Sequence, residues 1–172
     1  MGEAEAETEF AARFRRHYNE VLRFLERRVA DREDASELAG DVFRVAWQRF
    51  SPGSRAERAW LYAIARNVLG DHYRRTARQA TADQALNSAA LIEAQTVSSR
   101  GPADHPILTA LATLPATDQE AIRLRYWEHL STAEVAEVLG ITPVAARVRL
   151  HRARKQLRAA LHTTLEPKGM RS

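Results

Sequence analysis

The 172-residue chain carries 26 Lys and Arg against 22 Asp and Glu, a net charge of +4, and 45% of its residues are hydrophobic, which is enough for a buried core. It has no Cys, which excludes disulfides and thiolate metal sites, and no run approaches the ~18 apolar residues of a membrane span. With few Gly and Pro among abundant Ala, Leu, Arg and Glu, the composition predicts an all-α protein. The start, MGEAEAETEF, lacks the apolar core of a signal peptide. We therefore expect a cytoplasmic protein with no membrane contact of its own.

The first part of the chain predicts two helices. We expect residues 1–8 to fray, and a first helix to run from near Glu9 to about Val29, where apolar residues keep helical spacing. A second helix is expected over residues 31–50, with Asp31 or Asp34 as its N-cap. The outer face of the first helix is expected to carry a set of arginines: Arg13, Arg15, Arg16, Arg23, Arg27 and Arg28.

Three acids of the second helix share one face. Asp34, Glu37 and Asp41 step by three and four, the spacing of neighbours on a helix surface. The pattern fits a solvated face, a patch for a basic protein partner or a divalent-metal site. The metal site has the least support, because hard cations want several convergent oxygens and no other segment offers matching acids. The six His are scattered, so we predict no metal, no cofactor and no catalytic dyad.

A turn is predicted over residues 51–58 and a third helix over residues 59–78, with Tyr73 in its buried stripe. Other faces of this helix carry Trp60 next to several arginines. Aromatic rings stack on bases and guanidinium groups hold phosphates, so this surface suits single-stranded nucleic acid. Packing of Trp60 into the core is the simpler alternative. Residues 79–104 are rich in Ala, Ser, Thr and Gln and predict a linker, with one short helix near residues 86–93.

Residues 105–172 predict a second helical domain after a first domain of residues 1–78. A short helix should stop before Pro115, and Thr117 or Asp118 should cap the next one. Both would precede a tight pair of helices in the stretch STAEVAEVLGITPVAARVRLHRARKQL, residues 131–157. A helix-turn-helix of this size can place its second helix in a DNA major groove.

Turn chemistry supports the helix-turn-helix. Ser131 or Thr132 can N-cap its first helix, which runs out through about Leu139. Gly140 follows, where a left-handed backbone costs least. Thr142 can cap the second helix, with Pro143 at its first position, where a missing N–H has no cost.

The second helix of this pair has two chemically different faces, and we expect it to end near Leu161. Ala146, Leu150, Ala153 and Leu157 should face inward because they recur at helical spacing. No acid occurs between Arg147 and Arg158, whereas a solvated face usually mixes both signs of charge. The residues left for the other face are Arg147, Val148, His151, Arg152 and Lys155.

Three segments resemble bacterial RNA polymerase sigma factors of the extracytoplasmic-function (ECF) group: ASELAGDVFRVAWQRF, AWLYAIARNVLGDHYRR, and LATLPATDQEAIRLRYWEHLSTAEVAEVLGITPVAARVRLHRARKQL. The resemblance covers residues 10–78 and 105–161. It implies a protein that is not an enzyme, binds core RNA polymerase and directs it to promoter DNA. Most members of this family are held inactive by an anti-sigma factor, so the resemblance also implies such a partner.

The resemblance assigns roles to residues of both domains. The first domain resembles sigma2, whose second helix docks on the clamp helices of the large polymerase subunit through Asp34, Glu37, Leu38, Asp41, Val42 and Phe43. Its next helix and the preceding turn would capture the melted minus-ten strand with Arg55, Arg58, Trp60, Asn67, Asp71, Arg74 and Arg75. The second domain resembles sigma4, which would read the minus-thirty-five duplex with Arg147, Val148, His151 and Arg152, and hold phosphates with Arg149, Arg154 and Lys155.

Two other classes of protein remain as alternatives. A conventional helix-turn-helix regulator would bind DNA without polymerase, usually as a dimer on a two-fold site. A nucleic-acid enzyme would use Asp34, Glu37 and Asp41 as metal ligands. Under the sigma-factor hypothesis the isolated protein should bind promoter DNA poorly. Opening DNA costs ~1.4 kcal/mol per base-pair step, so the capture of a few bases cannot offset a whole bubble.

Overall fold

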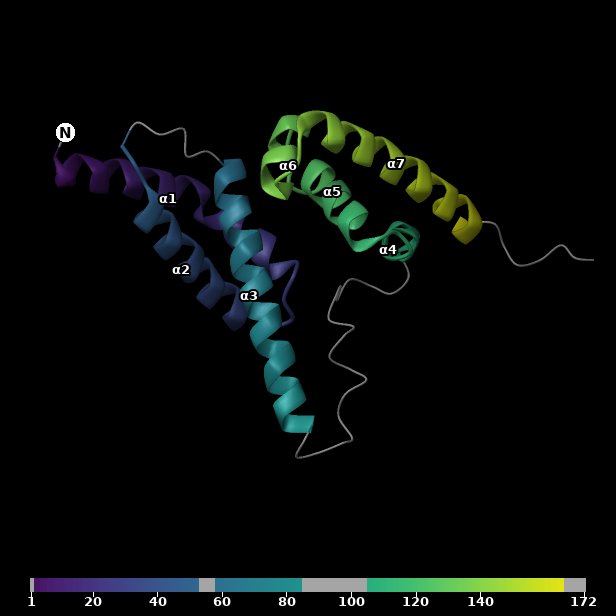
Figure 1. The fold of residues 1–172 in the computed structure, drawn as a ribbon, viewed down its shortest axis with the longest axis horizontal. Helices are drawn as coiled ribbons and strands as arrows, with labels where there is room; N and C mark the ends of the chain where they lie inside the picture. The colour runs from purple at the N-terminus through teal and green to yellow at the C-terminus, as the bar shows by residue number, and fades with distance from the viewer. Residues whose placement is uncertain (1, 53–57, 85–104, 166–172) are drawn as a thin grey trace, which may run out of the picture. The chain divides into compact units, whose positions relative to one another are not determined.

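The computed structural model describes residues 2–52, 58–84 and 105–165 of the chain (Figure 1). Every regular element in these ranges is an α-helix, as the composition predicted. The chain divides into two compact units, Met1–Ser99 and Arg100–Ser172, and each is described by itself. Among the helices of the described ranges, none combines the length and the apolar character needed to cross a bilayer.

The first unit is a bundle of three helices, α1 (Glu3–Glu26), α2 (Arg32–Arg49) and α3 (Arg58–Gln84). Each of the three packs against the other two (Figure 1). The rings of Phe24 and Tyr62 stack at 4.9 Å between centroids and join α1 to α3. Apolar side chains from all three helices form the core: Val21, Phe24, Leu25, Leu38, Val42, Phe43, Leu61, Tyr62 and Ile64.

The N-terminal helix begins earlier than predicted. Helix α1 starts at Glu3, so the prediction that residues 1–8 fray is wrong for residues 3–8. The backbone nitrogen of Gly2 donates to Glu5 Oε2 at 3.3 Å, which satisfies one donor at the helix start. Glu3 and Glu5 lie in the first turn, where negative charge interacts favourably with the helix dipole.

The end of α1 also differs from the prediction. Helix α1 stops at Glu26, and Arg28 is buried with 8% exposure instead of lying on the outer face. Its guanidinium carbon lies 3.6 Å from the centroid of the Phe24 ring, and its Nη1 donates to the Phe24 carbonyl at 3.0 Å. The hydroxyl of Tyr73 donates to the Arg28 carbonyl, which joins α3 to this turn. Tyr73 is half exposed, so its predicted place in the buried stripe is wrong.

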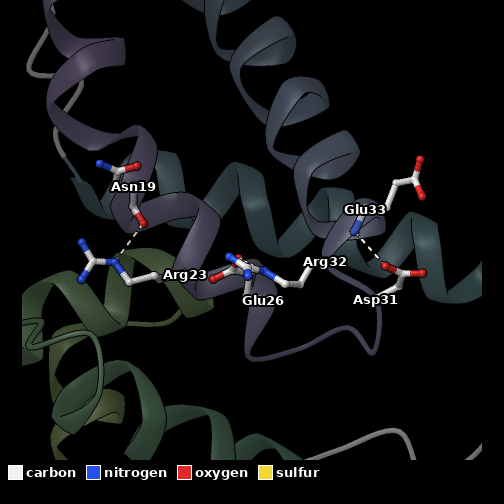
Figure 2. A network of polar contacts seen from close by, with 6 residues as sticks. All are labelled: Asn19, Arg23, Glu26, Asp31, Arg32 and Glu33. Carbon is white, nitrogen blue, oxygen red and sulfur yellow. Dashed lines mark hydrogen bonds and ion pairs between the residues drawn. The ribbon is translucent and has the colours of Figure 1, made fainter.

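The turn between α1 and α2 determines where α2 begins, and Figure 2 shows the polar contacts at this turn. Asp31 is the N-cap, and its Oδ1 accepts a hydrogen bond from the Glu33 backbone nitrogen at 2.8 Å. This selects Asp31 over Asp34, the other predicted cap. Across the turn, Arg32 Nε lies 3.2 Å from Glu26 Oε1. Asp34 is therefore left for the side of the helix.

Helix α3 continues past its predicted end at Arg78 to Gln84. Residues 79–83 contain neither Gly nor Pro, and they include alanines, which have the highest helix propensity. Thr81 Oγ1 donates back to the Ala77 carbonyl at 2.8 Å. The linker prediction is therefore wrong for residues 79–84, because the polar composition that suggested it is also compatible with a solvated helix. The predicted short helix at residues 86–93 lies outside the described residues.

The second unit contains α4 (Pro106–Ala112), α5 (Ala116–Tyr126), α6 (Thr132–Leu139) and α7 (Pro143–Leu165). Helix α7 packs against each of the other three (Figure 1). It extends past the predicted end at Leu161. The core cluster contains Leu111, Leu114, Ile122 and Ala153, with Trp127 and Leu157 packed against it.

Local chemistry sets the geometry between α6 and α7 as predicted. Ser131 Oγ accepts from the Glu134 backbone nitrogen at 3.2 Å, and Glu134 Oε2 accepts from the Ser131 nitrogen at 2.7 Å. Gly140 ends α6 in the left-handed region, with φ of 65°. Thr142 Oγ1 then accepts from the Ala145 nitrogen at 3.1 Å, and Pro143 is the first residue of α7. This confirms the predicted helix-turn-helix, including both caps and the corner glycine.

Candidate nucleic-acid interfaces

One face of α7 is exposed and basic. Ala146, Leu150 and Ala153 are buried against the rest of the unit, as predicted. The predicted contact residues Arg147, Val148, His151 and Lys155 are exposed. Within residues 105–165, the charged side chains of this set form no ion pair that would occupy them. This face therefore combines three basic or ionisable groups with one apolar side chain, Val148, which is 60% exposed.

Two other arginines of α7 face an acid on α5. Arg152 Nη2 donates to Asp118 Oδ1 at 3.1 Å, and Arg149 Nε lies 3.9 Å from the same oxygen. Asp118 is only 1% exposed. The N-cap of α5 is Pro115, so the predicted cap at Thr117 or Asp118 is wrong. Asp118 instead lies in the first turn and supplies α7 with the negative charge that its own sequence lacks.

The side chain of Arg154 contacts the end of α5 at Tyr126, whereas Arg149 and Arg152 face Asp118. Arg154 Nε donates to the Leu150 carbonyl at 3.2 Å, and its Nη1 donates to the Tyr126 hydroxyl at 3.4 Å. Arg154 and Tyr126 border an open groove of about 410 Å³. The residues that line it are Ile107, Ile122, Tyr126, Trp127, Arg154, Leu157, Arg158 and Leu161. In this structure the guanidinium of Arg154 is engaged with the end of α5.

Helix α3 carries a mixed polar surface. Arg58 and Trp60 are half-buried, so Trp60 combines the packing and the partial exposure that the sequence offered as alternatives. Arg74 Nη2 pairs with Asp71 Oδ1 one turn earlier in the same helix, and both side chains are mostly exposed. Arg55 lies outside the described residues. The members of the predicted minus-ten set that are exposed on this helix are Asn67, Asp71, Arg74 and Arg75.

The six residues expected to bind polymerase separate into two groups on α2. Leu38, Val42 and Phe43 are buried in the core of the first unit and hold the helix in place. The three acids are accessible: Glu37 is exposed, and Asp34 and Asp41 are half-buried. Asp41 Oδ1 accepts from Arg44 Nη2 at 3.0 Å. Only the acids, therefore, present side-chain surface of this set to a partner.

Asp34 and Glu37 also border a hollow of about 520 Å³ between α2 and α3. The opposite side includes His72, Arg75 and Asp83, so both signs of charge meet there. Nowhere in the described ranges do three His, Asp or Glu side chains converge as metal ligands would. The alternative of a metal-dependent nucleic-acid enzyme thus gains no support from the arrangement of Asp34, Glu37 and Asp41.

Comparisons with known proteins point to one family. Residues 13–79 match the family described as Sigma-70 region 2, and residues 104–157 match the family described as Sigma-70, region 4. The RNA polymerase sigma factor YlaC of Bacillus subtilis is 30% identical over 151 residues, which cover 84% of this chain and 87% of YlaC. The ECF RNA polymerase sigma factor SigL of Mycobacterium tuberculosis is 32% identical over 160 residues, which cover 88% of this chain and 90% of SigL.

Two solved structures have a similar fold. The sigma factor RpoE of Bartonella quintana, in complex with the anti-sigma factor NepR, matches with a TM-score of 0.63 and 24% identity over 92% of this chain and 99% of RpoE. CnrH, in complex with the cytosolic domain of CnrY, matches with a TM-score of 0.60 and 26% identity over 91% of this chain and 90% of CnrH.

Proposed function

Because this chain belongs to the ECF group of bacterial RNA polymerase sigma factors, which act in promoter-specific transcription initiation, we propose that its two units divide promoter recognition between them. Residues 1–78 would form the unit for polymerase and the minus-ten element, and residues 105–172 the unit for the minus-thirty-five element. Helix α3 continues the first unit to Gln84, and residues 85–104 connect it in sequence to the second. The match to both sigma regions disfavours a conventional helix-turn-helix regulator, which has no need of the first.

The exposed basic face of α7 is the observation that carries the proposal. Arg147 and His151 present hydrogen-bond donors, and Lys155 presents an ammonium group, on the second helix of a helix-turn-helix. Arg side chains pair bidentately with guanine, and lysines hold phosphates. The exposed Val148 donates no hydrogen bond but fits a thymine methyl group. In this proposal α7 lies in the major groove of the minus-thirty-five duplex, where Arg152 also reads a base edge, and Arg149 and Arg154 lie beside the phosphates.

The minus-ten element is assigned to α3 and the turn before it. Asn67, Arg74 and Arg75 are exposed, and Trp60 is half-buried. A melted strand offers bases for stacking and phosphates for guanidinium groups, so the chemistry of this surface suits it. Arg55, Arg58 and Asp71 complete the proposed set. Duplex DNA would offer Trp60 no unstacked base.

The acidic side of α2 is the proposed polymerase contact. Asp34, Glu37 and Asp41 are accessible, while Leu38, Val42 and Phe43 keep their backbone fixed from inside the core. Asp41→Lys should lower the affinity for core polymerase severalfold and leave the helix content unchanged, because the charge lies outside the core. Titration of labelled core enzyme would measure this. Unchanged affinity would remove this face from the interface.

The proposed protein partner and cellular location of this chain follow from its membership in the ECF group. RpoE has been solved with an anti-sigma factor, and we extend such a partner to this chain. The chain would work in the cytoplasm, where it meets DNA and polymerase, and would have no membrane contact of its own. Its contribution would be binding rather than catalysis, with no cofactor of its own.

The deciding experiment is run-off transcription on genomic promoter DNA. New, discrete transcripts should appear only when the chain and core polymerase are both present, and their start sites should share two upstream elements. Footprinting with the chain alone should give weak protection, since melting needs the polymerase. Strong selective footprints without polymerase, together with no transcripts, would overturn the proposal in favour of a conventional regulator.

A further inference from the structure

Asp118 is a buried residue in the first turn of α5, and its carboxylate faces Arg149 and Arg152 of α7. We propose that it is a positioning residue for promoter reading, and that it sets the orientation in which Arg152 meets the DNA. This inference rests on the proposed function of α7. It adds a residue that lies outside the helix-turn-helix and has no exposed surface with which to touch DNA itself.

Arg152 lies between the solvent and the buried interior of the second unit. Its side chain is 56% exposed, while its partner Asp118 is 1% exposed. One guanidinium nitrogen, Nη2, donates to Asp118 Oδ1 at 3.1 Å. A guanidinium group has five N–H donors in a rigid plane, so one bond to a fixed oxygen orients the others. The remaining donors are then available on the accessible side of α7.

The Asp118 carboxylate should hold Arg152 firmly because it has few other hydrogen-bond partners among the described residues. Oδ1 is the atom that both Arg149 and Arg152 approach, and within the described residues the buried Oδ2 has no hydrogen-bond partner. A buried carboxylate without a cation is costly, so Asp118 keeps its arginines close. The position of Asp118 in the first turn of α5 adds a favourable interaction with the helix dipole. The arginines are thus held before any DNA arrives.

Because Asp118 orders the Arg152 side chain before DNA binds, binding should cost less side-chain entropy. A free Arg side chain loses rotamer entropy when it is fixed against a base edge. Arg152 has already lost much of that freedom to Asp118. The carboxylate also lowers the net positive charge of the surface, which weakens sequence-independent attraction to phosphates. Both effects favour selectivity over bulk affinity.

The test is a promoter library with a randomised minus-thirty-five element, transcribed by holoenzyme made with the full chain. Arg152→Ala should abolish the preference at one base step. Asp118→Asn keeps the shape but loses the charge, and should weaken the preference at that same step by roughly five- to tenfold, the lower part of what a bidentate contact supplies. In the Arg152→Ala background, Asp118→Asn should have no further effect on base preference.

The matched control is Glu137→Gln, which removes one negative charge from an exposed position on α6. It should leave every base preference as in the wild type. Even loss of transcription across all library members with Asp118→Asn, or no change in the step that Arg152 reads, would overturn the inference. If the Asn variant does not fold, Asp118→Glu replaces it: relaxation at the Arg152 step supports the inference and an unaltered preference refutes it. If wild-type holoenzyme selects no minus-thirty-five sequence, the proposed function itself fails.

Discussion

Helices α3 and α7 both carry exposed arginines, but they hold them in different ways. Arg74 on α3 pairs with Asp71 one turn earlier, and both side chains are mostly exposed. Arg152 on α7 pairs with Asp118, which comes from another helix 34 residues away and is buried. The first arrangement is local and adjustable, whereas the second is built into the packing of α5 against α7.

This difference suggests two ways of meeting nucleic acid. Exposed pairs within one helix contribute little stability and can rearrange at low cost, which suits a flexible single strand. An arginine fixed by a buried acid keeps one geometry, which suits the regular edge pattern of a duplex groove. The two surfaces can therefore be separated by experiment.

The largest effect is expected from removing both cations that face Asp118. Arg149→Ala combined with Arg152→Ala should lower the free energy of unfolding by about 2–3 kcal/mol, less than a fully buried pair would give because Arg152 is 56% exposed. Urea denaturation of the full chain measures it. Adding Asp118→Asn should recover part of the loss, since it removes the buried charge. A loss below about 0.5 kcal/mol would place this pair among ordinary surface pairs.

The next effect concerns selectivity on α7. Arg147→Ala should cost about 1–3 kcal/mol of discrimination at one base step, because this exposed arginine is assigned to a base edge. Lys155→Ala is its counterpart: it should weaken binding evenly across sequences and reduce the salt slope by about 1. Holoenzyme binding to a set of promoter variants at several salt concentrations separates the two. Uniform losses in both variants would abolish the distinction between base and phosphate contacts.

A smaller effect is expected at the start of α7. Thr142→Ala removes the acceptor for the Ala145 nitrogen and should lower the free energy of unfolding by about 1 kcal/mol. Thr163→Ala is the matched control, because Thr163 lies inside α7 and its Oγ1 donates back to the Ala159 carbonyl. Its loss should be near zero in the same thermal or urea melts. Equal losses would mean that the corner contributes nothing beyond helix propensity.

The smallest effect should come from α3. Asp71→Asn breaks the exposed pair with Arg74 and should change the free energy of unfolding by less than about 0.5 kcal/mol. Urea denaturation alongside the α7 variants gives a direct comparison. A loss above 1 kcal/mol would show that α3 also depends on a fixed pair.

The sequence predicted best where the controlling chemistry is local. Ser131, Gly140 and Thr142 act on neighbours within a few residues, so their roles could be deduced from spacing. Asp118 was misassigned as a cap, because a carboxylate shortly after a proline has a familiar local use and its true partners lie in another helix. Arg28 was placed on the surface for a related reason, since only the packed ring of Phe24 shows where it goes.

The candidate sites follow the same rule. Periodicity identified the exposed face of α7 and the acids of α2, but it did not show that Arg154 turns toward Tyr126. The family resemblance, not periodicity, grouped Leu38, Val42 and Phe43 with the acids as contact residues, although all three are buried. A helix face can be assigned from spacing, whereas the partner that a long side chain chooses depends on which helices pack together.

The hydrogen bond from Tyr73 to the Arg28 carbonyl has a mechanical consequence. Tyr73 directly precedes Arg74 and Arg75, which we assign to the captured strand. A force that bound DNA exerted on this part of α3 would therefore be shared with the turn that follows α1, and through the Arg28 side chain with the Phe24 ring in the core. Under this assignment, a load on the two surface arginines would reach the core of the unit through these contacts.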